Sequence, residues 1–75
     1  MTHRLVSPQA RYFADNMRKL RNGIYSQQQL ASLALISPGT VMRYENYRNE
    51  PTIVAAKRIA VALGVSLDAM IARHL

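Results

Sequence analysis

The chain has 75 residues and no cysteine, so it is large enough for one small domain and excludes a disulfide framework or a thiolate metal site. Hydrophobic residues make up 49% of it and are mostly aliphatic, which favours a compact helical core over disorder. Ten Lys and Arg against four Asp and Glu give a formal net charge of +6, a balance that favours a polyanionic partner without requiring one.

The first predicted helix spans residues 8–21. Ser7 followed by Pro8 is typical of a helix start, with a hydroxyl cap before a proline at the first helical position. Asn22-Gly23 is a stop signal at its end. Between these signals, apolar residues with helical spacing form one stripe, which comprises Phe13, Met17 and Leu20.

Two short helices joined by a tight turn are predicted in residues 26–45. Ser26 and Gln29 form an S-x-x-Q capping box at the start of the first, and Ser37-Pro38 begins the second a few residues later. In that second helix Val41 and Tyr44 are expected to face inward. A different face carries Thr40 and Arg43.

The remaining chain predicts two more helices after a polar loop. Thr52 caps a fourth helix, which Gly64 ends, and Ser66 caps a short fifth one. The fourth helix has an apolar stripe made of Ala56, Ile59, Ala60 and Leu63. Five short helices predict a compact all-α domain over residues 8–75, preceded by an N-terminal arm at residues 1–7.

Consecutive short helices are a weak functional signal by themselves, because many helical bundles contain them. In a helix-turn-helix, however, the first helix crosses the DNA backbone and the second enters the major groove. An arginine on the outward face, such as Arg43, can bind guanine O6 and N7 with two hydrogen bonds.

From Leu20 to Ile71 the chain resembles the lambda-repressor-like, Cro/CI-type (XRE) family of helix-turn-helix domains. The matching segments stand in the family's order, without a gap from Ser26 onward. They are LR (20, 21), SQQQLA (26 to 31), IS (36, 37), TVMRYEN (40 to 46), PT (51, 52) and IAVALGVSLDAMI (59 to 71). The resemblance implies a five-helix fold and a regulator, expected to be a repressor, that binds double-stranded DNA as a homodimer.

The resemblance also implies roles for individual residues. The positions that would read bases from the recognition helix are Pro38, Gly39, Thr40, Met42 and Arg43. The positions that would bind phosphates, or alternatively remain solvated polar residues, are Gln27, Asn46, Arg48 and Asn49. Arg21 and Glu45 match a pair that is often joined by a salt bridge in the family.

Several positions depart from the family pattern. Leu35 stands in the turn where the family usually has glycine, and a left-handed Leu would cost roughly 1 to 2 kcal/mol, so the turn could be rebuilt. Tyr47 also replaces a usual glycine, and its ring could pack on the loop or lie on the DNA. The NGIY connection (22 to 25) is one residue shorter than is typical. Pro38 and Gly39 cannot hydrogen-bond a base edge through their side chains, which narrows direct readout to Thr40 and Arg43, with Met42 as a possible addition.

The dimer surface is expected near the C-terminus. Met70, Ile71 and Leu75 offer more apolar residues than a short terminal helix needs internally, although all of them could serve the core. The loop 46–50, with Tyr47, is an alternative surface, and the arm could instead reach along the DNA.

Other classes of function fit less well. An antitoxin-like or regulator-inhibiting module, with autoregulatory DNA binding, is the alternative. Enzymatic activity, cofactors and a small-molecule ligand are not expected, because the four acidic residues are scattered and no phosphate-binding Gly loop is present. His3 and His74 lie at opposite ends, so no metal site is expected. RNA-binding signatures and a membrane-spanning run are absent, and we expect the bacterial cytoplasm or nucleoid as its location.

Overall fold

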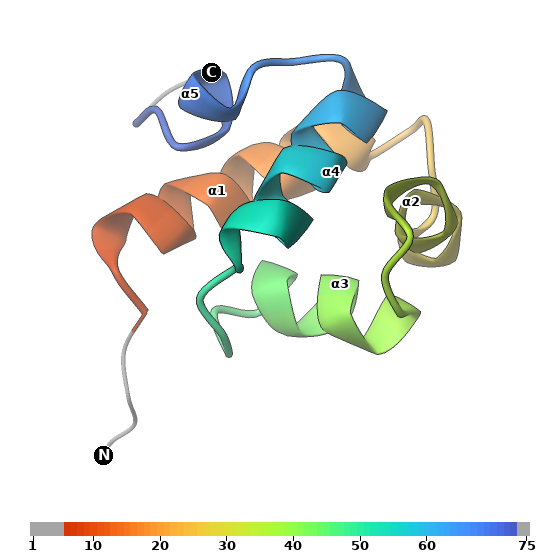
Figure 1. The fold of residues 1–75 in the computed structure, drawn as a ribbon, viewed down its shortest axis with the longest axis horizontal. Coiled ribbons are helices and arrows are strands. Elements are labelled where there is room, and N and C mark those ends of the chain that lie inside the picture. The colour runs from red at the N-terminus through yellow and green to blue at the C-terminus, as the bar shows by residue number, and fades with distance from the viewer. Residues whose placement is uncertain (1–5, 74–75) are drawn as a thin grey trace.

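The computed structural model describes residues 6–73, and within them the chain forms five α-helices and no strand (Figure 1). The helices are α1 (Pro8–Arg21), α2 (Gln27–Ala34), α3 (Pro38–Glu45), α4 (Ile53–Leu63) and α5 (Leu67–Met70). In Figure 1, α4 crosses in front of α1, α3 lies along the lower edge, α2 lies at the right and α5 at the top. The predicted all-α class with a helix-turn-helix at the second and third helices is confirmed.

Every helix begins at a hydroxyl side chain that accepts a hydrogen bond from the backbone N–H three residues later. Such a cap contributes about 1 kcal/mol, because it satisfies an N–H group that has no partner inside the helix. At α2 the predicted capping box is complete, since the Ser26 backbone N–H also donates to Gln29 Oε1 at 2.8 Å. The capping residues are Ser7, Ser26, Ser37, Thr52 and Ser66.

The core lies where α1, α2, α3 and α4 meet, and α5 closes it. Its largest fully buried side chains are Phe13, Met17, Leu30, Val41, Ile59 and Met70. Met70 has 0% exposure, which corrects the expectation that it lies on a dimer surface. The helix α5 has only four residues, and Met70 is the one that it buries in the core. Val6, which belongs to the expected arm at residues 1–7, is only 7% exposed and therefore packs on the fold.

A buried asparagine joins the last helix to the first. Asn16, in the middle of α1, is buried, and its Nδ2 donates to the carbonyl oxygens of Ala69, Met70 and Ala72 at 3.3, 2.9 and 3.0 Å. Ala69 and Met70 are the last two residues of α5, where a helix leaves its acceptors without internal partners, and Ala72 follows just after it. The side chain therefore acts as the C-terminal cap of a helix that lies more than fifty residues away in sequence.

The turn after α2 keeps the usual geometry of a glycine-containing turn, although its central residue is Leu35. Leu35 has φ 60° and ψ 42°, in the left-handed region. The Ile36 N–H donates to the Ala31 carbonyl at 3.0 Å and the Leu35 N–H to the Ser32 carbonyl at 3.3 Å, which is a Schellman motif. The expectation of a rebuilt turn is therefore wrong. With its side chain 74% exposed, Leu35 gains little packing in return for the unfavourable backbone.

Candidate nucleic-acid interface

The α2–α3 pair presents one face to the core and another to solvent. On α3, Val41 and Tyr44 are buried, as predicted, and they fix the rotation of the helix about its axis. Met42 and Arg43 are therefore exposed, and Thr40 is half-buried at the first turn. The inward face of α3 thus determines which side chains can meet a ligand.

Thr40 and Arg43 meet at the start of α3. Arg43 Nη2 donates to Thr40 Oγ1 at 3.2 Å, and that oxygen lies 2.8 Å from Ser37 Oγ. A Cβ built on Gly39 would lie 3.4 Å from Arg43 Nη1, so the guanidinium extends across the first turn of the helix. Pro38 and Gly39 occupy that turn and contribute shape rather than side-chain hydrogen bonds.

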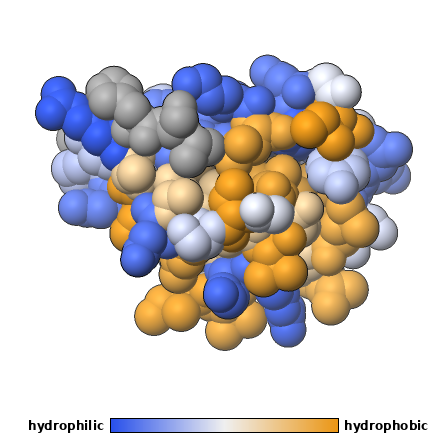
Figure 2. All heavy atoms as spheres, turned by 90° about the horizontal axis from the view of Figure 1, so that it is seen from above, coloured by the Kyte–Doolittle hydropathy of each residue, from blue (hydrophilic) through white to orange (hydrophobic). Residues whose placement is uncertain are grey.

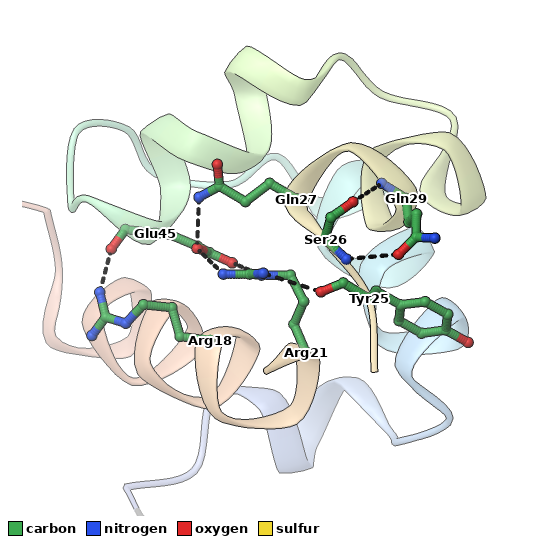
Figure 3. A network of polar contacts seen from close by, with 7 residues as sticks. All are labelled: Arg18, Arg21, Tyr25, Ser26, Gln27, Gln29 and Glu45. Carbon is green, nitrogen blue, oxygen red and sulfur yellow. Dashed lines mark hydrogen bonds and ion pairs between the residues drawn. The ribbon is translucent and has the colours of Figure 1, made fainter. Parts of the chain in front are cut away.

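A buried carboxylate connects the three N-terminal helices (Figure 3). Glu45, 2% exposed, accepts hydrogen bonds from Arg21 Nε at 2.7 Å, Arg21 Nη2 at 3.0 Å and Gln27 Nε2 at 2.9 Å. The salt bridge between Arg21 and Glu45 is therefore confirmed. Arg21 Nη1 also donates to the Tyr25 carbonyl at 3.1 Å. We call Arg21, Gln27 and Glu45 the Glu45 network.

Gln27 belongs to this network as well as to the predicted phosphate contacts. Its amide nitrogen carries two hydrogens, and the bond to Glu45 uses one of them. The side chain is half-buried and stands at the first residue of α2, where backbone N–H groups also favour an anion. The geometry therefore leaves one N–H of Gln27 for a phosphate oxygen.

The loop 46–50 carries the other predicted phosphate contacts, and all its residues are exposed. Tyr47 has φ 61°, and its hydroxyl donates to Asp15 Oδ1 on α1. The Arg18 guanidinium lies 5.6 Å from the centre of the Tyr47 ring. The ring therefore packs on α1, which was not among the expectations for it. Asn46, Arg48 and Asn49 are exposed to solvent, so a phosphate group of DNA could reach their side chains.

Arg18 is a residue that the sequence did not single out. Its Nη2 donates to Asp15 Oδ1 at 2.7 Å and its Nη1 to the Glu45 carbonyl at 2.6 Å. Hydrogen bonding to the Tyr47 side chain raises the pKa of Arg18 above its usual value, and partial burial opposes this effect. The electrostatic influence of Tyr47, Asp15 and Glu45 raises the pKa further. The spacing of Asp15 and Arg18, three residues apart on a helix, is the signal that could have pointed to this cluster.

An apolar hollow of about 170 Å³ lies between the start of α1, the loop before α4, and α5. Ile71 lines it, together with Ile53, which is 81% exposed and which the sequence did not single out. Seen from the α5 side, apolar residues form a broad area on the face of the molecule (Figure 2). Leu75, the other residue expected on a dimer surface, lies outside the described residues.

Residues 17–70 match a family described as helix-turn-helix (HTH_3), of the XRE type. The match covers well over half of the chain, and the protein belongs to this family. No match was found among curated protein sequences.

Solved structures of transcription regulators are similar to the whole domain. The hypothetical transcription factor NHTF from Neisseria has a TM-score of 0.78 and 27% identity, with 95% of this chain and 83% of that chain covered. The restriction-modification controller protein C.AhdI from Aeromonas hydrophila has a TM-score of 0.77 and 23% identity, with coverages of 85% and 98%. At this lower identity, C.AhdI supports the fold alone.

Structures of an enzyme, the hydroxypropylphosphonic acid epoxidase from S. wedmorenis, are also similar. One of them has a TM-score of 0.71 and 33% identity, and the match covers 81% of this chain but only 33% of the epoxidase. The likeness is therefore confined to one part of that protein. Family membership, together with the similarity to NHTF, identifies the chain as a non-enzymatic, DNA-binding transcriptional regulator. No helix within residues 6–73 is long and apolar enough to cross a membrane.

Proposed function

We propose that the protein is a repressor that binds its operator as a homodimer at the bacterial nucleoid, with α3 of each copy in the major groove. The observation that carries this proposal is the Thr40–Arg43 pair on the exposed face of α3. The buried Val41 and Tyr44 orient that face, and the Glu45 network holds α3 against the start of α2. A helix fixed in this way meets the groove without reorganisation.

Arg43 is the principal base-reading residue in this proposal. Its guanidinium donates two hydrogen bonds to guanine O6 and N7, while Thr40 contacts a neighbouring base edge and Met42 a thymine methyl group. Pro38 and Gly39 add no hydrogen bond, but the small first turn allows the start of α3 to approach the bases closely.

Phosphate binding completes the contact. Gln27 donates its second amide hydrogen, and Asn46, Arg48 and Asn49 meet the backbone beside the recognition helix. Each phosphate neutralised by a basic side chain releases counterions, so binding by a chain of net charge +6 weakens steeply with salt. These contacts position the domain and do not select the sequence.

The dimer forms through Ile71, Leu75 and the hollow that Ile53 borders. Ile53 and Ile71 are exposed apolar side chains beside one hollow, and a second copy would remove both from water. In Figure 1 the start of α1 lies to the left of α3, and α5 lies at the top, away from α3. A neighbour joined there leaves α3 open in both copies, as two successive major grooves about 34 Å apart require. Repression rests on the resemblance to Cro/CI-type domains, since an occupied operator excludes polymerase.

Selection of bound sites from random duplex DNA tests the proposal directly. Arg43→Ala should relax the preference at one base pair of each half-site, at a cost of about 1 to 3 kcal/mol. Gln27→Ala should weaken all duplexes by a similar factor. Arg58→Ala, at an exposed arginine on α4, is the matched control and should leave the preference unchanged. An unaltered site preference in the Arg43 variant would refute the role given to α3.

Sedimentation with and without operator tests the dimer. Ile71→Glu should dissociate the dimer. Val61→Glu is the control and should leave the dimer intact, because Val61 is an exposed residue of α4 that does not line the hollow. A protein that remains monomeric on DNA and recognises a single unrepeated half-site would contradict the dimer.

A further inference from the structure

The loop 46–50 is attached to α1 at both of its ends. At one end Tyr47 packs on Asp15 and Arg18. At the other, Glu50 accepts hydrogen bonds from the backbone N–H and the hydroxyl of Ser7, the N-terminal cap of α1. Arg48 and Asn49 lie between the two attachments and are exposed. Contacts with α1 and its N-terminal cap therefore help to hold the loop in position.

Tyr47, which attaches the loop to α1, has an unfavourable backbone conformation. Tyr47 has φ 61°, a conformation that is costly for a residue with a Cβ and that glycine adopts freely. Backbone hydrogen bonds hold this turn, as they do at Leu35, but at Tyr47 the side chain also offsets part of the cost. Its hydroxyl donates to Asp15, and its ring lies beneath the Arg18 guanidinium.

The same backbone conformation sets the direction of Arg48. The Arg48 N–H donates to the Arg43 carbonyl at 2.8 Å, and the Tyr47 N–H to the Tyr44 carbonyl at 3.2 Å. Arg18 also donates to the Glu45 carbonyl at 2.6 Å, next to these bonds. A change in the backbone at Tyr47 would therefore turn Arg48 relative to α3, whose side chains read the bases.

We propose that Asp15, Arg18 and Tyr47 are positioning residues for DNA binding, which hold the loop so that Arg48 reaches a phosphate while α3 occupies the groove. This inference rests on the proposed function. None of the three touches the DNA, and their effect passes through Arg48. Tyr47 accordingly belongs to this cluster and not to the dimer surface.

The test measures duplex affinity against salt for Tyr47→Gly, Tyr47→Phe and the unchanged protein. Tyr47→Gly removes both side-chain contacts that hold the loop on α1. Because glycine can adopt this backbone but is not confined to it, the domain should remain folded while the loop is free to leave the position that directs Arg48. The affinity of this variant at roughly 0.1 M salt should fall about fivefold to tenfold on every duplex, the amount that one phosphate contact supplies. The slope of log affinity against log salt should become shallower by about 0.9. Tyr47→Phe loses only the hydroxyl and should lose about twofold to threefold.

Two controls separate positioning from stability. Leu35→Gly relieves the same backbone conformation at an exposed side chain and should leave affinity and slope unchanged. In an Arg48→Ala background, Tyr47→Gly should have no further effect on affinity, because the contact that it positions is already gone.

The outcomes decide between the possibilities. An unchanged salt slope in Tyr47→Gly, or an equal loss of affinity with and without Arg48, would overturn the positioning role alone. Conversion to a monomer by Tyr47→Gly would assign Tyr47 to the dimer surface and also overturn it. If the unchanged protein binds no duplex, the proposed function fails as well.

Discussion

Replacing Glu45 with alanine should remove a large part of the stability of the domain. Glu45 is almost fully buried and accepts three hydrogen bonds, two from Arg21 and one from Gln27. Removing one partner of a buried ion pair costs about 3 to 5 kcal/mol, because the other charge remains buried without compensation. The Arg21 side chain is 13% exposed, so water partly solvates its charge in the variant. We therefore expect a loss of stability near the lower end of this range, about 3 kcal/mol.

That loss is large for a chain of this size. At roughly 0.05 to 0.15 kcal/mol per residue, the 75 residues have a total stability of roughly 4 to 11 kcal/mol. Urea unfolding followed by circular dichroism measures the difference, provided that the slope of the transition is unchanged. Glu45→Gln keeps one acceptor oxygen and should lose about 2 kcal/mol.

Asp68→Ala is the matched control for Glu45→Ala. It removes an exposed carboxylate from the first turn of α5 and should cost about 0.3 to 1 kcal/mol. If Glu45→Ala is no more destabilising than Asp68→Ala, the reasoning about the buried pair is incorrect. Arg21→Met combined with Glu45→Leu should recover most of the loss, because no unpaired charge then remains buried.

Three further predictions concern the core and the turn, and urea unfolding checks each of them. Leu35→Gly should raise the stability by about 0.5 to 1 kcal/mol, since glycine accepts the left-handed backbone, and a decrease would contradict the cost assigned to Leu35. Met70→Ala should lower the stability by about 2 to 5 kcal/mol, and a much smaller loss would indicate that Met70 lies on the surface. Asn16→Ala should cost about 1 to 3 kcal/mol and speed amide exchange in α5 first, while uniform exchange across all helices would argue against its capping role.

The helices could be predicted from the sequence because their signals are local. A hydroxyl residue at each N-terminus, Pro8 and Pro38 after two of them, and Gly64 after α4 act within a few residues of where they stand. Leu35 could not be predicted in the same way. Its intrinsic preference opposes the left-handed conformation, and the packing of α2 against α3 and α4 overrides that preference.

The remaining differences arise from contacts between distant parts of the chain. Tyr47 bonds a residue thirty-two positions earlier, and no periodicity within the loop indicates Asp15 as its partner. Met70 and Ile71 are adjacent apolar residues, and a helix of one turn has no repeat that distinguishes the buried one from the exposed one. Arg21 and Glu45 could be paired beforehand only through the family resemblance.

The Glu45 network has a consequence for how the protein meets DNA. Because α1, α2 and α3 converge on one buried carboxylate, the two helices of the DNA-binding unit cannot adjust to each other without breaking that network. If the DNA-binding surface of the protein and the straight duplex do not fit each other, the duplex must then bend. Bending a duplex costs less at flexible pyrimidine–purine steps than in stiff A-tracts, so base pairs that no side chain touches should still affect affinity. We therefore expect part of the operator to be selected by its mechanical properties.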